Sequence, residues 1–206
     1  MYKKIALVLC LLTSLSVHAQ SIADMWINCP EQLTPYLTKN DRKEMIECRN
    51  IGVDTKVTNK LKETSDIISL ADDYGCFMLS ESKDIQILRL PTENDSIYLC
   101  IETVKLPECQ STVRFYDKTW KPVPNEGKIA DIQEEAFWAK PDTMTAERFV
   151  ELKHLISLVF VEYRYSPELQ ALIAQPNIAF ITEEEKKHIN AIISKKILKW
   201  DGASFN

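Results

Sequence analysis

The sequence predicts an α+β fold in which antiparallel sheets have helices packed on one side. Residues 53–116 hold six short runs rich in Ile, Thr, Val, Tyr and Phe, with no helix-length segment between them, so neighbouring strands should pair antiparallel. Segments with helical periodicity precede these runs, and further helices and strands follow a proline-containing connection. We therefore expect two halves, each with helices and a small sheet, at 20–117 and 143–206, joined by an irregular connection at 118–142.

Residues 1–19 have the pattern of an export signal. Two lysines precede an apolar stretch of about 13 residues, shorter than the roughly 20 that a membrane-spanning helix needs. Small residues before Gln20 favour cleavage after Ala19. A bulky leucine before Cys10 disfavours lipid attachment there. We expect export to the periplasm or the extracellular space, without a lipid anchor, and a mature chain that begins at Gln20.

Composition excludes several function classes. The four glycines lie far apart, so neither a G-x-G-x-x-G motif nor a phosphate-binding P-loop can be written. Removal of the signal leaves 23 basic residues against 30 acidic ones, a net charge of −7. An acidic chain without runs of basic residues lacks the positively charged surface that binds nucleic acid. We expect no cofactor, no nucleic-acid partner and no membrane insertion after signal cleavage.

Two short helices are expected first. Ser21 has capping-box spacing, and an apolar stripe follows it as far as Cys29. The second helix should begin at Asn40-Asp41 and end at Gly52, because glycine suits the left-handed position after a helix.

Strands are expected next, each bounded by turn-forming residues. They are placed at about Val53–Thr58, Ile67–Leu70, Cys76–Ser80, Ile85–Leu90, Ile97–Val104 and Thr112–Tyr116.

The second half should contain a helix, a hairpin, a helix and a strand. Asp142-Thr143 is expected to begin the first helix, and Thr182 has the spacing of a capping box for the second. The strands are placed at Leu158–Tyr165, Leu169–Ala174 and Ile197–Trp200.

Five cysteines remain after signal cleavage, and export favours disulfides. Packing of the two N-terminal helices would bring Cys29 to Cys48, and Cys100 and Cys109 flank one turn. These pairs are the disulfide candidates, and small buried hydrophobes are the alternative. An odd number of cysteines leaves at least one outside any intramolecular pair.

Catalytic motifs are lacking in the sequence. His154 and His188 stand alone on predicted helices, without a second ligand at zinc-site spacing, and the four glycines permit no G-x-S-x-G motif. We therefore expect no catalytic residues and no metal site. Two alternatives stay open: a hydrolase whose carboxylate or histidine site is assembled in space, and a protein inhibitor.

Two tryptophans, Trp120 and Trp138, lie in the irregular connection, where aromatic side chains on a loop can form a recognition surface. Core packing is the alternative. The leading hypothesis is an exported, non-catalytic cell-envelope module that binds another protein or a glycan.

Four segments, in order, carry a resemblance: SIADMW at 21–26, YLTKNDRKEM at 36–45, VRFYDKTWKPV at 113–123 and KWDGASF at 199–205. Together they resemble a family of secreted Bacteroidetes proteins catalogued as a domain of unknown function. The resemblance implies a bacterial cell envelope, and it brings no known activity or cofactor. In that context Ser96 and Thr143, each between an aspartate and an apolar residue, are possible O-glycosylation sites.

Overall fold

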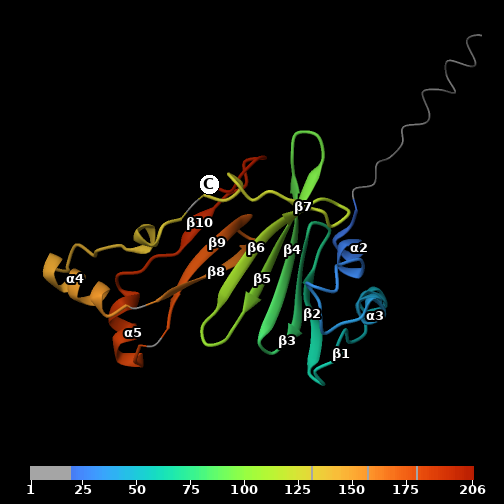
Figure 1. The fold of residues 1–206 in the computed structure, drawn as a ribbon, viewed down its shortest axis with the longest axis horizontal. Coiled ribbons are helices and arrows are strands. Elements are labelled where there is room, and N and C mark those ends of the chain that lie inside the picture. The colour runs from blue at the N-terminus through green and yellow to red at the C-terminus, as the bar shows by residue number, and fades with distance from the viewer. Residues whose placement is uncertain (1–19, 131, 157, 180) are drawn as a thin grey trace, which may run out of the picture.

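The computed structural model describes residues 20–130, 132–156, 158–179 and 181–206 (Figure 1). It confirms an α+β fold with two antiparallel sheets, one of seven strands and one of three. The predicted export signal and Ala19 lie outside the described residues, which begin at Gln20.

The large sheet is a meander in which every strand pairs antiparallel with the next one along the chain. Its strands are β1 (Val57–Thr58), β2 (Thr64–Leu70), β3 (Tyr74–Ser80), β4 (Lys83–Pro91), β5 (Ser96–Val104), β6 (Gln110–Tyr116) and β7 (Pro122–Val123). Six of these match the predicted strands, and β7 lies inside the segment predicted to be irregular. Alternation of apolar residues along β3 to β6 gives the sheet two buried faces.

The small sheet has the order β10-β9-β8. Its strands are β8 (Val159–Ser166), β9 (Ala171–Ile178) and β10 (Lys196–Leu198). The hairpin of β8 and β9 turns near Pro167, as predicted, and the register pairs Tyr163 with Ala174.

Most helices begin near their predicted positions. They are α2 (Ile22–Ile27), α3 (Lys39–Asn50), the 3₁₀ helix η1 (Glu134–Phe137), α4 (Ala146–His154) and α5 (Glu183–Asn190). Ser21 caps α2 and Thr182 forms a capping box on α5. Two predicted starts were wrong: Thr38 caps α3 and Thr145 caps α4, because each hydroxyl accepts from the backbone N–H three residues later. Gly52 has φ +73° after α3, which confirms its predicted left-handed conformation.

One face of the large sheet packs against α2 and α3 (Figure 1). Trp26 of α2 stacks on Phe77 of β3 with ring centroids 3.9 Å apart and planes 4° apart. We name this face the helix face. Its buried core also includes Met25, Met45 and Ile87.

The other face packs against the small sheet, and we name it the sheet face. Leu88, Leu99 and Phe115 of the large sheet share a core there with Leu172 and Leu198 of the small sheet. The two sheets are therefore held by one layer of apolar side chains. Helices α4 and α5 lie at the end of the molecule opposite α2 and α3 (Figure 1). In the described part of the chain, no helix combines the length and apolarity needed to span a membrane.

Candidate functional site

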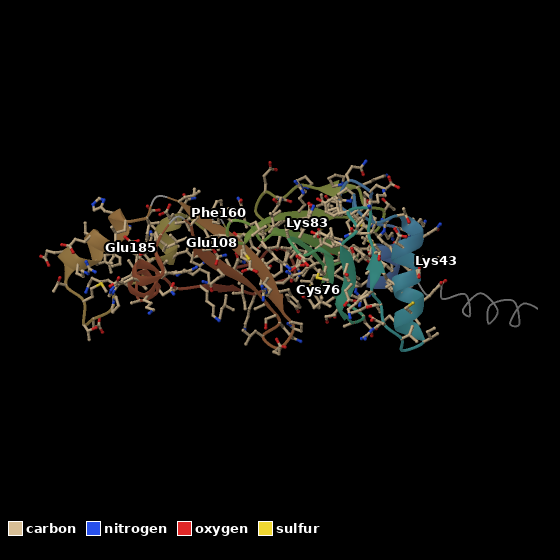
Figure 2. The ribbon with its side chains drawn as sticks, turned by 90° about the horizontal axis from the view of Figure 1, so that it is seen from below. Lys43, Cys76, Lys83, Glu108, Phe160 and Glu185 are labelled. Carbon is tan, nitrogen blue, oxygen red and sulfur yellow. The ribbon has the colours of Figure 1, made fainter. Side chains whose placement is uncertain are left out.

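A cavity of about 400 Å³ lies where the sheet face meets strand β8. We call it the inter-sheet cavity. Strands β2 to β5, with Lys105 beyond β5, form its floor, and Glu162 and Arg164 of β8 form its wall. Its lining is Ile68, Ser69, Tyr74, Cys76, Met78, Asp84, Gln86, Thr103, Lys105, Glu162 and Arg164. Figure 2 shows Cys76 on the large sheet, between α3 with Lys43 at one end and α5 with Glu185 at the other.

A β-bulge in β2 shapes the floor. The register passes from Ile67 opposite Phe77 to Ser69 opposite Cys76, so Ile68 is an extra residue. Without the bulge, Ser69 would point to the helix face. The bulge places Ile68 and Ser69 on the cavity side together, and Ile68 is 58 % exposed there.

Side chains of the large sheet hold β8 in place. Gln86 Oε1 accepts from the Tyr165 backbone N–H at 3.1 Å and from the Tyr74 hydroxyl at 3.2 Å. Ser111 Oγ accepts from the Tyr163 N–H at 2.9 Å and donates to the Tyr163 carbonyl at 3.3 Å. Partly buried backbone groups of β8 are thereby satisfied, which fixes the wall relative to the floor.

Two ion pairs lie along the cavity. Lys105 Nζ is 2.8 Å from Asp84 Oδ2, and Arg164 Nη2 is 2.6 Å from Glu162 Oε1. Asp84 Oδ1 is buried and has no hydrogen-bond partner among the described residues. An unmet acceptor of this kind costs about 1–3 kcal/mol. A donor supplied by a ligand at Asp84 would remove that cost.

The one thiol in the cavity lining is not activated. Burial raises the pKa of Cys76, with the nearby Asp84 charge acting in the same direction. Burial also raises the pKa of Tyr74. A nucleophilic cysteine needs a lowered pKa and an adjacent base, and no histidine lines this cavity.

The five described cysteines are free thiols, so neither predicted disulfide is present. Cys29 and Cys100 belong to the core of the helix face. Cys48 lies half-buried on α3, whose deeply buried residues are Arg42, Met45 and Ile46. The register of β5 and β6 places Cys100 opposite Arg114, whereas Cys109 precedes β6 and its backbone carbonyl accepts from Asn177 of β9 at 2.9 Å. The hairpin of β5 and β6 therefore does not place Cys100 and Cys109 opposite each other.

The structure does not bring Trp120 and Trp138 together on one surface. Trp120 is 9 % exposed in the core of the helix face, where its Nε1 donates to the Met25 carbonyl at 3.1 Å. Trp138 is half-buried near Ile193 of the second half, with Lys153 Nζ 5.3 Å from its ring centroid. The predicted aromatic surface is therefore corrected, because Trp120 fills the core under α2.

The two histidines among the described residues are exposed, His154 at the end of α4 and His188 on α5. Among the described residues, no three His, Cys, Asp or Glu side chains gather as a metal site would require. Ser96 is half-buried at the start of β5, and Thr143 is exposed in the turn before α4. O-glycosylation at these two positions stays a prediction.

Sequence reasoning missed the inter-sheet cavity. The alternation of Glu162 and Arg164 with tyrosines along β8 was visible, and it indicated a strand with one polar side. The residues that β8 faces lie 50 or more positions earlier in the chain. Only the packing of the two sheets brings these residues together.

Comparison with known proteins shows the family and a solved structure of the same fold. A family model described as "Protein of unknown function (DUF3256)" matches residues 14–205. The chain is similar to a solved structure described as "Structure of a domain of an uncharacterized protein from Porphyromonas gingivalis W83", with a TM-score of 0.74 and 20 % sequence identity. The similarity covers 91 % of this chain and 99 % of that one, and it shows a shared fold. No curated protein matches the sequence.

Proposed function

The chain belongs to the DUF3256 family of proteins of unknown function, and from that premise we propose that it is an exported, non-catalytic binding module for an extended polypeptide segment of another protein. The inter-sheet cavity is the proposed site. The observation that carries the proposal is its lining: an apolar floor with Ile68 and Met78, bordered by the charged pairs Asp84–Lys105 and Glu162–Arg164.

This lining suits a peptide. A peptide presents apolar side chains, charged side chains and backbone amides along one line, and a cleft with apolar and paired charged groups can meet all three. The buried Asp84 Oδ1 supplies an acceptor for an amide or a basic side chain of the partner. Sugar recognition in this cavity is less well supported, because its aromatic ring, Tyr74, is 7 % exposed and offers little stacking surface.

The hydrolase alternative has less support. Asp84 and Glu162 share the cavity, but each already pairs with a cation at 2.8 Å or less. A catalytic carboxylate must be free to reach the substrate, and here an ion pair occupies each of the two groups. We therefore place the function in binding.

A peptide library tests the proposal. The chain from Gln20 to Asn206 is immobilised, and random twelve-residue peptides displayed on phage are selected on it. We expect Ile68→Asp to weaken the selected peptides at least tenfold, because it puts a charge on the apolar floor. Ile197→Asp on β10, where the isoleucine is 49 % exposed, is the matched control and should leave affinity unchanged. Equal binding to both variants, or no selected peptide, would overturn the proposed function.

Export is tested separately. The support is the pattern of residues 1–19, with a charged start, a short apolar stretch and small residues before Gln20. Mass spectrometry of the protein from its native cells should find an N-terminus at Gln20 in the envelope or culture fluid. A cytoplasmic protein that retains residues 1–19 would contradict export.

A further inference from the structure

A second cavity, of about 500 Å³, opens on the helix face of the large sheet, beyond the core under α2 and α3. We call it the polar cavity. Along β4, β5 and β6 the residues of this face change from apolar to polar toward the cavity. Its lining is Gln32, Leu33, Lys83, Glu102, Val104, Gln110, Thr112, Arg114 and Tyr116. Lys83, on the large sheet, is labelled in Figure 2.

Three charged side chains cross the floor of this cavity in a row. Glu102 is the central one: its Oε2 is 2.9 Å from Lys83 Nζ, and its Oε1 accepts from Arg114 Nη1. Glu102 and Lys83 are largely buried, with side chains 13 % and 18 % exposed, whereas Arg114 is 49 % exposed. The row carries one net positive charge on an acidic protein.

The row orients the guanidinium of Arg114. Glu102 holds one nitrogen, and Lys83 holds Glu102 from the other side, so the arginine side chain is fixed at its inner edge. Its Nε and Nη2 make no hydrogen bond to the part of the chain that the structure describes. A guanidinium held in this way offers two parallel N–H donors, which is the arrangement that binds a carboxylate or sulfate group.

Beyond the charged row, the polar residues of the lining are neutral. Gln110 and Thr112 precede Arg114 on the same side of β6, and Gln32 comes from the segment after α2. Amide and hydroxyl groups both donate and accept hydrogen bonds, so they match the hydroxyl groups of a sugar ring. Tyr116 closes the lining on the side of the core.

We propose that the polar cavity binds an acidic saccharide, with Arg114 on its carboxylate or sulfate and Gln32, Gln110 and Thr112 on its hydroxyls. The site lies on the opposite face of the large sheet from the inter-sheet cavity. It is therefore independent of the proposed peptide binding.

The test is an NMR titration of the chain from Gln20 to Asn206. The probes are a galacturonate trisaccharide, a sulfated chondroitin oligosaccharide, neutral maltotriose and sodium acetate. We expect an acidic sugar to shift the amides of β5 and β6 around Glu102 and Arg114, and maltotriose to bind at least tenfold more weakly. The carboxylated and sulfated probes show which acid group the site prefers.

Variants decide whether Arg114 carries the binding. Arg114→Gln should lower the affinity for the preferred acidic sugar at least tenfold. Arg114→Lys keeps the charge without the two parallel donors, so its affinity should lie between those of the parent chain and Arg114→Gln. Arg148→Gln on α4 is the matched control, because Arg148 also pairs with a glutamate and its side chain is 48 % exposed, close to the 49 % of Arg114. No bound sugar, equal binding of maltotriose, shifts matched by acetate alone, or unchanged binding in Arg114→Gln would overturn the proposal.

Discussion

Arg42 is the residue on which the N-terminal part of the fold depends most directly. The residue is 2 % exposed, and its guanidinium makes five hydrogen bonds. The acceptors are the carbonyls of Trp26, Ile27, Cys29 and Leu37 and the hydroxyl of Thr34. Carbonyls at the end of an α-helix lack N–H donors within the helix. Arg42 of α3 donates hydrogen bonds to those at the end of α2. Burial lowers the pKa of this arginine, because the interior disfavours its charged form.

Replacing Arg42 with methionine should lower the free energy of unfolding by about 3 kcal/mol. The apolar chain fills part of the space, but several buried carbonyls lose their donor. Urea denaturation followed by circular dichroism measures the loss. Arg148→Met, on the exposed side of α4, is the control and should change stability by less than about 0.5 kcal/mol. Equal stability of the two variants would show that Arg42 does not fasten α2.

Cys29 makes stability depend on pH in the alkaline range. Burial raises the pKa of its thiol to about 12 from an ordinary value of 9.0. Between these values the unfolded chain loses a proton that the folded chain keeps. The contribution of this thiol to the free energy of unfolding is therefore fully present below pH 9. Above pH 9 that free energy falls by up to about 1.4 kcal/mol per pH unit.

Cys29→Ala should make the decline in unfolding free energy above pH 9 less steep. Denaturation with TCEP present, at several pH values from 8 to 10.5, gives the slope for each variant. Val150→Ala, at an exposed position of α4, removes no titratable group and should keep the slope of the parent chain. Identical slopes for all three proteins would contradict the assigned burial of Cys29.

At the residue level, the sequence predicted helix caps that depend on hydrogen bonds between residues close in the chain. Ser21 and Thr182 were recognised as caps because each is followed three residues later by an acid that completes the motif. Arg42 could not be recognised, because a charged residue on a short polar helix is normally solvated. Its partners come from the end of α2 and from the segment between α2 and α3, and backbone carbonyls carry no signature in the sequence.

The contact between α2 and β3 depends on Gly75. A Cβ atom at this position would lie 2.7 Å from two ring carbons of Phe77 and 2.8 Å from Ile22 Cγ2. Both neighbours are fully buried. Strand β3 needs a glycine here so that α2 can pack closely against the sheet.

Gly75→Ala should therefore cost about 1–3 kcal/mol of unfolding free energy, since the methyl group has no space. Phe77→Leu removes both nearby ring carbons, and the double variant should lose less than the sum of the two single losses. Chemical denaturation of the four proteins in this cycle measures the coupling. Additive losses would mean that the methyl group does not meet Phe77.

At the element level, strand prediction succeeded where alternation and turn residues agree. The strands from β2 to β6 were all expected, because each run has apolar residues and is bounded by turn-forming ones. The two-residue strand β7 was missed, since Pro122 and Val123 give too short a pattern. The bulge at Ile68 was also missed, because its register depends on the partner strand.

The two sheets share one core, and we expect them to unfold as one unit. Leu172 of β9 is fully buried against residues of the large sheet, in the same cluster as Leu88 and Phe115. Leu172→Ala should lower the unfolding free energy of the whole chain by about 3 kcal/mol. Hydrogen exchange should then accelerate equally in β4 and β9. Leu169→Ala, in the exposed turn before β9, is the control.

Faster exchange in β9 with unchanged exchange in β4 would instead show that the small sheet unfolds alone. Coincident transitions from circular dichroism and tryptophan fluorescence give a second check, because Trp26 of α2 packs on Phe77 of the large sheet and Trp138 lies beside Ile193 of the second half.

At the level of the whole molecule, the fold class was predictable and the candidate site was not. Local patterns show that strands alternate and pair in order, which is enough for an α+β meander. The inter-sheet cavity exists because β8 docks through Gln86 and Ser111, and the aromatic surface predicted at Trp120 failed because α2 covers that side of the sheet. The packing of the two sheets and of α2 depends on side chains that are far apart in the sequence, so no short segment predicts it.

The strictly sequential order of the large sheet has a consequence for the time that folding takes. Each of its strands needs only to meet the strand made just before it, so every pairing closes a short loop. Such local pairings form within microseconds to milliseconds in small proteins. The slow step should be the arrival of the small sheet, whose strands must find partners more than 50 residues away. The chain would therefore pass through a stage in which the sheet face is bare and most open to wrong partners.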